Sequence, residues 1–264
     1  MTSRKQQKEQ LRARRLAEEQ ARAERARRQR RVRTLAGVVV VAIAIVAVAI
    51  AISSGGAGST PKPHSTAARR AAAAVDGLLN GIPQSGDTIG SPHAPVTVTE
   101  FADLKCPYCR EFTLGPEAEL ISKDVRAGRV RITYRSLCTA TCNGPQPEVF
   151  KTQQTAALAA GEQNRAWYYI ELFYQLQGDE TTSYVTPAFL DGLAKLVPRL
   201  DYAKWSTDRG SPRLAALVSA DQRAAQALGF SGTPSLLIRG PKGTRKIAEL
   251  TDYGTYESAI RSVQ

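Results

Sequence analysis

The chain has 264 residues, of which 42% are hydrophobic, and a formal net charge of +12. This length is enough for one well-packed core with accessory segments. Residues 1–34 hold 13 lysines and arginines against 4 acidic residues, so they carry +9 of the net charge and leave +3 for the remainder. The globular part is therefore only mildly basic, which excludes a nucleic-acid-binding domain there, and no nucleic-acid partner is expected.

The N-terminal segment, residues 1–34, is basic and rich in Arg, Gln, Glu and Ala. These residues favour a helix, but the segment has no wide apolar face that could pack into a core. We expect a solvated or membrane-surface helix here.

Residues 35–52 form an apolar run of 18 residues without a charge or a proline. As a helix this run would be about 27 Å long, close to the hydrocarbon thickness of a bilayer. The flank before it is strongly basic and residues 53–58 after it are uncharged. The positive-inside rule predicts a single-pass protein of the cell membrane, with a cytoplasmic N-terminus and an extracytoplasmic C-terminal domain. A cleaved signal peptide is the alternative, but its apolar and charged regions are usually shorter.

Residues 53–75 are expected to be a linker, and residues 76–264 a globular domain. Period-two alternation and apolar runs predict strands at 96–102, 129–137, 235–238 and 246–250, with a turn at 240–243. Helices are predicted at 106–127, where Pro116 breaks or kinks the middle, and at 148–163, 166–177, 187–197, 212–228 and 256–263. Aromatic residues of the 166–177 helix are expected in the core. The order is β-α-β, a helical block, then β-β-α.

The most informative motif is Cys106-Pro107-Tyr108-Cys109, where a predicted helix follows a predicted strand. A thiol at a helix N-terminus meets unpaired N–H groups and the positive end of the helix dipole, and both stabilise its thiolate. Cys109 lies one turn later on the same face, within reach of a disulfide. Pro107 suits the first turn, where its missing N–H costs nothing. A reactive dithiol is favoured over a structural disulfide or half of a metal site.

Cys138 and Cys142 form a second pair, in a loop between a strand and a helix. All four cysteines follow the apolar run, and an even number of cysteines in an oxidising compartment favours disulfides. We expect a structural disulfide between Cys138 and Cys142. A second exchanging pair that relays electrons to Cys106 and Cys109 is the alternative. A four-sulfur zinc site is disfavoured, because thiols outside the cytoplasm tend to oxidise.

The element order resembles a thioredoxin fold with a helical insertion. Residues 90–103 followed by Cys106-Pro107-Tyr108-Cys109 resemble the DsbA-like thiol:disulfide oxidoreductases, and Gly232-Thr233-Pro234 matches the cis-proline loop of that family. The resemblance covers about residues 75–264. It implies an α/β, thioredoxin-like fold with a helical insertion, preceded here by the single transmembrane helix.

The resemblance also implies roles for the motif residues. Cys106 would be the nucleophile, exposed at the helix tip, and Cys109 would lie deeper and resolve the mixed disulfide. Pro107 and Tyr108 would set the redox poise, through the backbone N–H groups around the Cys106 sulfur.

Residues outside the motif complete the expected site. Thr233–Pro234 would be a cis peptide that faces the dithiol and pairs with the substrate backbone. Glu100 would be a buried acid that helps proton transfer from the deeper cysteine, with a solvent-facing carboxylate as the alternative. Asp103 and Lys105 are expected at the surface near the site.

The implied function is an anchored, extracytoplasmic oxidoreductase that passes its disulfide to exported, reduced proteins. A membrane quinone-linked partner would reoxidise it, and no bound cofactor is needed, because the dithiol carries the electrons. The opposite direction, isomerase or reductase, stays open, since the Pro-Tyr pair and the Thr before the proline occur in both. A non-catalytic anchored binding domain with structural cysteines is the third hypothesis.

Overall fold

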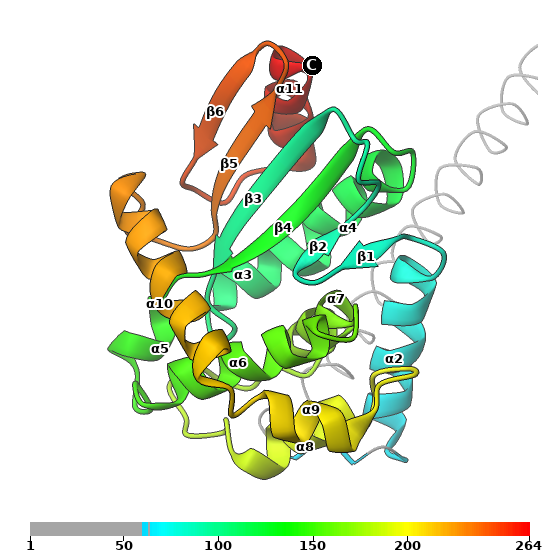
Figure 1. Cartoon of the computed structure of the whole chain (residues 1–264), viewed down its shortest axis with the longest axis vertical. Helices are drawn as coiled ribbons and strands as arrows, with labels where there is room; N and C mark the ends of the chain where they lie inside the picture. The colour runs from blue at the N-terminus through cyan, green and yellow to red at the C-terminus, as the bar shows by residue number, and fades with distance from the viewer. Residues whose placement is uncertain (1–59, 63) are drawn as a thin grey trace, which may run out of the picture. The chain divides into compact units, whose positions relative to one another are not determined.

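The computed structural model describes residues 60–62 and 64–264 (Figure 1). The predicted basic segment 1–34, the predicted transmembrane helix 35–52 and the first part of the predicted linker lie outside the described residues. Among the helices that the structure does describe, none combines the length and the apolar character needed to cross a membrane.

A mixed sheet organises the domain, with strands in the spatial order β1-β2-β4-β3-β5-β6. Their bounds are β1 Gln84–Ser85, β2 Thr88–Ile89, β3 Val96–Ala102, β4 Val130–Ser136, β5 Ser235–Gly240 and β6 Gly243–Ile247. β3 and β4 are parallel, and the other neighbouring pairs are antiparallel. The central strands β3, β4 and β5 are largely buried, because helices cover both faces of the sheet, as parallel pairing requires.

The segment after β3 is a nearly continuous helical run. It consists of α3 (Pro107–Phe112), a π-helical segment (Thr113–Glu117), α4 (Ala118–Leu120) and a second π-helical segment (Ile121–Val125). Pro116 lies in the first π-helical segment. Proline lacks an N–H and disrupts a regular helix, and the wider π turn accommodates it. The predicted helix at 106–127 is confirmed, together with its distortion at Pro116.

A helical insertion lies between β4 and β5. Its helices are α5 Ala140–Asn143, α6 Val149–Gly161, α7 Ala166–Gln175, α8 Pro187–Ala194, α9 Tyr202–Asp208 and α10 Pro212–Ala227. Figure 1 shows α6 to α9 gathered at one end of the sheet, whereas the C-terminal helix α11 (Tyr253–Val263) packs beside β5. Residues 166–174 of α7 are all buried, and Phe173 meets Phe189 of α8 edge-on, with 5.3 Å between ring centroids. The aromatic residues of this helix are core residues, as predicted.

The helix α2 (Thr66–Leu79) begins earlier than the sequence analysis expected. Ser65 caps it, because the Ser65 hydroxyl accepts a hydrogen bond of 3.1 Å from the N–H of Ala68. One face of α2 is buried at helical spacing, through Ala68, Ala71, Val75 and Leu79. The predicted linker boundary at residue 75 is therefore too late, since alanines of the Ala-Arg stretch pack towards α7.

Several short elements were not predicted. β1 and β2 have two residues each, too few for a periodic pattern, and α5 and α9 are also short. The Asp201 carboxylate caps α9 by accepting from the N–H of Lys204 (3.0 Å). β6 was expected at 246–250 but starts directly after the turn, at Gly243, and its residues are mostly exposed, so apolar spacing gave no signal.

Three glutamates lie inside the core: Glu100 on β3, Glu117 in the first π-helical segment and Glu171 on α7. Both carboxyl oxygens of Glu100 and of Glu117, and one of Glu171, have no hydrogen-bond donor among the described residues. Burial raises the pKa of all three carboxyl groups, and the neighbouring Glu117 raises the pKa of Glu100 further. Glu100 and Glu117 face each other closely enough to hydrogen-bond once one is protonated. They therefore share a proton at neutral pH.

Replacing Glu117 by glutamine is expected to stabilise the protein at about pH 8 by about 1–3 kcal/mol. Folding raises the pKa of this carboxyl, so its contribution to the stability of the folded state is fully present below the ordinary glutamate pKa of about 4.3. It is lost as the pH rises through the raised value, because an ionised carboxylate is then buried. The free energy of unfolding is measured in urea at about pH 5 and about pH 8. It should fall less between these two pH values in Glu117→Gln than in the wild type.

The matched control is Glu119→Gln. Glu119 is half-exposed and pairs with Lys123 at 2.7 Å, so this change should alter stability by less than about 1 kcal/mol at either pH. If Glu117→Gln kept the pH dependence of the wild type, the raised pKa of the buried pair would be contradicted.

Candidate active site

Cys106 lies at the junction of β3 and α3. β3 ends at Ala102 and α3 begins at Pro107, so Cys106 is the N-cap residue of the helix. Its side chain makes no capping hydrogen bond, and Pro107 occupies the first turn. The N–H groups at the start of α3 therefore remain available to the Cys106 sulfur. The thiols of Cys106 and Cys109 are both free.

The two thiols have opposite acidities. Polar groups that favour its thiolate lower the pKa of Cys106 to about 7: first the Cys109 thiol, then the Thr233 side chain and the N–H groups of Cys109 and Tyr108, while burial opposes them. Burial raises the pKa of Cys109 well above its ordinary value. Cys106 therefore ionises far more readily than Cys109 near neutral pH. This division suits a nucleophile and a buried partner.

Cys106 is less exposed than the sequence analysis expected, since only 4% of its surface is accessible. The loop before β5 covers it: the Cys106 thiol donates to the carbonyl oxygen of Thr233, with 3.5 Å between sulfur and oxygen. The Thr233–Pro234 peptide bond is cis, as expected. Tyr108, between the two cysteines, is 62% exposed. Cys106 and Thr233, which are 127 residues apart in the sequence, are thus in contact through the Cys106 sulfur.

Glu100 lies in the core behind the dithiol and is 1% exposed. Its charge contributes to the raised pKa of Cys109, which places the two groups near each other. Glu117, the partner of Glu100, was missed by the sequence analysis. Its signal was present: Cys109, Thr113 and Glu117 recur at four-residue intervals on one face of the helical run, and all three are buried.

Asp103 and Lys105, expected at the surface, are both buried. The Asp103 carboxylate accepts hydrogen bonds from the N–H groups of Lys105 (3.0 Å), Thr139 (2.9 Å) and Thr141 (2.8 Å). The Lys105 ammonium donates to the carbonyl oxygen of Thr182 at 3.0 Å. The surface prediction was wrong because the helical insertion, which provides these partners, covers the loop between β3 and α3.

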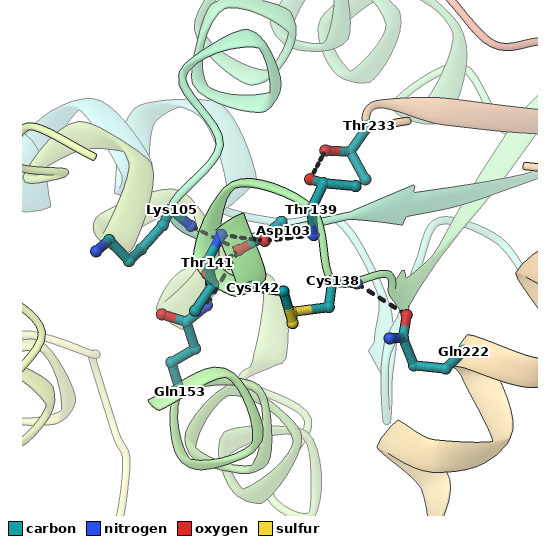
Figure 2. Close-up of a disulfide and its surroundings, with 9 residues drawn as sticks. All are labelled: Asp103, Lys105, Cys138, Thr139, Thr141, Cys142, Gln153, Gln222 and Thr233. Carbon is teal, nitrogen blue, oxygen red and sulfur yellow. Dashed lines mark hydrogen bonds between the residues drawn. A yellow bond between two sulfur atoms is a disulfide. The ribbon is translucent and has the colours of Figure 1, made fainter. Parts of the chain in front are cut away.

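A disulfide joins Cys138 and Cys142 in the loop that includes α5. Figure 2 shows this loop between Asp103 on one side and Thr233 on the other. The hydroxyl oxygens of Thr139 and Thr233 are 2.6 Å apart, and the N–H of Cys138 donates to the Gln222 side chain at 2.8 Å. The second cysteine pair is therefore linked by hydrogen bonds to the loop that covers Cys106. His93 is exposed in the loop before β3.

Two curated proteins are similar to this chain in sequence. The chain is 28% identical over 160 residues to the "Probable disulfide bond formation protein D" of Bacillus anthracis, covering 58% of this chain and 69% of that protein. It is 25% identical over 177 residues to the "Disulfide bond formation protein D" of Bacillus subtilis, covering 65% and 74%.

Two solved structures of oxidoreductases or related proteins have a fold similar to that of this chain. Oxidised BdbD from Bacillus subtilis has a TM-score of 0.58 at 20% identity, and the match covers 69% of this chain and 97% of that one. A thioredoxin-like oxidoreductase from Silicibacter pomeroyi has a TM-score of 0.54 at 26% identity, covering 70% and 95%.

The family model described as thioredoxin matches residues 84–261, from β1 into α11, and so includes both cysteine pairs and the cis-proline loop. The site within this range contains an acidic thiol at a helix start, a buried partner thiol and a cis-proline loop that faces them. The chain therefore belongs to the thioredoxin family and is a DsbA-like thiol:disulfide oxidoreductase.

Proposed function

We propose that this protein introduces disulfides into exported proteins, and that the disulfide it donates is the one between Cys106 and Cys109. The low pKa of Cys106 beside the raised pKa of Cys109 supports an exchanging dithiol, and the relatives named as disulfide bond formation proteins support the oxidising direction. A stabilised Cys106 thiolate favours the dithiol form, and the disulfide form is then the better oxidant.

The reaction takes two exchange steps. A substrate thiolate first attacks the Cys106 sulfur of the Cys106–Cys109 disulfide, a new S–S bond joins substrate to Cys106, and Cys109 leaves as a thiolate. A second substrate thiolate then attacks the substrate sulfur of this mixed disulfide, and Cys106 leaves as a thiolate. Two electrons have passed from the substrate dithiol to the enzyme, and the substrate has gained one disulfide.

The leaving Cys109 thiolate needs a proton, because Cys109 is completely buried and its pKa is raised. Water does not reach it in this position, so an internal acid has to supply the proton. The Glu100–Glu117 pair holds a shared proton at neutral pH, and the charge of Glu100 acts on Cys109. We assign the proton donor in the first step to Glu100, with Glu117 as its partner.

The cis-proline loop and Tyr108 form the substrate contact in this proposal. An extended substrate segment adds its backbone to the loop at Thr233, whose carbonyl oxygen is 3.5 Å from the Cys106 sulfur. Tyr108 is 62% exposed and offers an aromatic surface next to the reacting sulfur. Backbone pairing and apolar contact do not depend on a particular side-chain sequence, which suits unfolded, reduced clients.

The proposal includes a membrane anchor formed by residues 35–52. The 18-residue apolar run, its basic N-terminal flank and its uncharged C-terminal flank support an extracytoplasmic location for the domain. Such an anchor keeps the Cys106–Cys109 pair close to the membrane surface, where a membrane quinone-linked partner would reoxidise it.

The opposite direction, reductase or isomerase, has one observation in its favour. The pKa of Cys106 is about 7, which is the value of the reactive cysteine in thioredoxin, whereas that of DsbA is about 3.5. The acidity of Cys106 thus supports an exchanging dithiol in both directions, and the reduction potential decides between them.

The substitution Cys106→Ala is expected to reduce oxidation of a reduced two-cysteine peptide to the uncatalysed background, because the remaining thiol, Cys109, is inaccessible. Cys109→Ala should instead trap a mixed disulfide between Cys106 and an oxidised peptide, visible on non-reducing gels, since no resolving thiol remains. His93→Ala, in an exposed loop, is the control and should keep wild-type activity. Full activity of Cys106→Ala would refute the proposed nucleophile.

The reduction potential of the Cys106–Cys109 pair is expected near −120 mV, the value of a strong oxidase, and not near −270 mV, the value of a reductase. It is measured by equilibrating the protein with glutathione mixtures and quantifying alkylated peptides by mass spectrometry, which separates this pair from Cys138 and Cys142. A potential near −270 mV would overturn the oxidase direction and leave the exchange chemistry intact.

The anchor is expected to hold the full-length chain in the membrane fraction, with the domain accessible from outside. To test this, a tag is attached to each end of the chain, and protease is added to intact cells from which any outer membrane or cell wall has been removed. The C-terminal tag should be lost and the N-terminal tag protected. A soluble exported fragment that begins after residue 52 would instead show that the apolar run is a cleaved signal peptide.

A further inference from the structure

The last turn of α7 is fastened to the segment that carries the reacting cysteine. The Tyr174 hydroxyl donates to the backbone carbonyl oxygen of Asp103 at 3.3 Å, and the same carbonyl accepts from the N–H of Cys106 at 2.9 Å. On the other side of the cysteine, the Nε–H of Arg110 on α3 donates to the carbonyl oxygen of Tyr174 at 3.0 Å. The helical insertion therefore contacts the chain both before and after Cys106.

Gln177 lies two residues beyond the end of α7 and bonds to the backbone of Cys106 itself. Its side-chain nitrogen donates to the carbonyl oxygen of Leu104 at 2.7 Å and to that of Cys106 at 3.1 Å. An amide nitrogen carries two protons, so these two acceptors use both of them and determine which way the amide points. In the described part of the chain, no other side chain donates to either carbonyl.

The position of the Cys106 sulfur depends on the backbone around it. Cys106 has an extended conformation as the N-cap residue of α3, and its side chain makes no capping bond that would hold it there. Its carbonyl accepts the first bond of the helix, from the N–H of Arg110 at 3.1 Å. A shift of this peptide group would therefore move the sulfur relative to the free N–H groups at the start of α3.

We propose that Gln177 is a positioning residue for the exchange reaction. Its amide holds the peptide groups that follow Leu104 and Cys106, and so keeps the Cys106 sulfur at the start of α3. Gln177 makes no hydrogen bond to either thiol among the described residues, so it acts through the Cys106 backbone. This proposal rests on Cys106 being the reacting sulfur, as in the proposed function, and it gives the helical insertion a part in that site.

The charged and titratable groups around this turn stay in place when Gln177 is replaced by an uncharged residue. They are Cys109 and Arg110 on α3, Glu100 on β3, Asp103 and Lys105 in the turn, and Tyr174 on α7. The loops at 138–142 and 229–234 contribute none, since their two cysteines are joined in a disulfide and their other residues carry no charge. The Gln177 side chain bonds to none of these six side chains in the part of the chain that the structure describes.

The experiment measures the rate of Cys106 alkylation against pH in the reduced full-length chain, with the modified cysteine assigned by mass spectrometry. Gln177→Met keeps the length of the side chain, adds no charge and removes both donors. The turn is then held less firmly, so the midpoint of the pH profile should rise by about 0.5–1 pH unit. The equilibrium of the Cys106–Cys109 pair with glutathione should move towards the disulfide form, because a less stabilised thiolate makes the dithiol less favourable.

The matched control is Gln175→Met. Gln175 is the last residue of α7, and its side chain makes no hydrogen bond to the Cys106 turn among the described residues. This change should leave both the midpoint and the glutathione equilibrium at their wild-type values.

A second variant, Gln177→Ala, is used in case methionine disturbs the packing. Gln177 is half-buried, so water can reach the two carbonyls when the side chain is shortened, and the midpoint should again rise. Thermal unfolding identifies the variants that fold. An unchanged midpoint in a folded Gln177 variant, or an equal shift in Gln175→Met, would overturn the proposed role of Gln177. A wild-type midpoint at the ordinary cysteine value would overturn the proposed function together with it.

Discussion

The rest of the structure depends on the polar groups that converge on the Cys106 sulfur and stabilise its thiolate. Two of these groups are the N–H groups of Tyr108 and Cys109, which help to lower the pKa of Cys106 and have no partner inside the helix because α3 begins at Pro107. This geometry requires β3 to end at Ala102 and a short turn to place the cysteine as the N-cap residue. The strand, the turn and the helix start are thus one functional unit, and the sheet holds that unit in place.

The same helix imposes the opposite requirement on its second cysteine. Cys109 points into the core, where a thiolate has no water and no cation to stabilise it, so every exchange step that frees this sulfur needs an internal proton. In the proposed mechanism the Glu100–Glu117 pair meets this need, since burial and their closeness raise the pKa of both carboxyl groups. Such a pair destabilises the fold at alkaline pH. Buried, unpaired carboxyl groups are usually avoided in a protein core, and where they occur they often lie next to a functional site, as they do here.

The parts of this site that could be predicted from the sequence are those with a local signal. β3 has alternating apolar residues, the Cys-x-x-Cys segment follows it directly, and Thr233-Pro234 precedes a β-rich run. The burial of Asp103 could not be predicted, because its partners Thr139 and Gln153 lie 36 and 50 residues away in the sequence. The short strands β1 and β2 gave no periodic signal for the same physical reason: long-range packing stabilises them. Glu117 is the intermediate case, since its helical spacing from Cys109 was visible but Pro116 argued against a continuous helix.

The redox direction of this enzyme depends on groups outside the Cys-x-x-Cys motif. A hydrogen bond to a charged group contributes about 1.5–3 kcal/mol, and about 1.4 kcal/mol corresponds to about 30 mV for a two-electron couple. One hydroxyl turned towards the Cys106 thiolate therefore changes the potential by about 30–60 mV. The gap between a reductase and an oxidase is about 150 mV, so a few such bonds span it. Thr233 helps to lower the pKa of Cys106 in this chain, although it lies 127 residues away in the sequence, so the Cys-x-x-Cys motif alone does not set the potential.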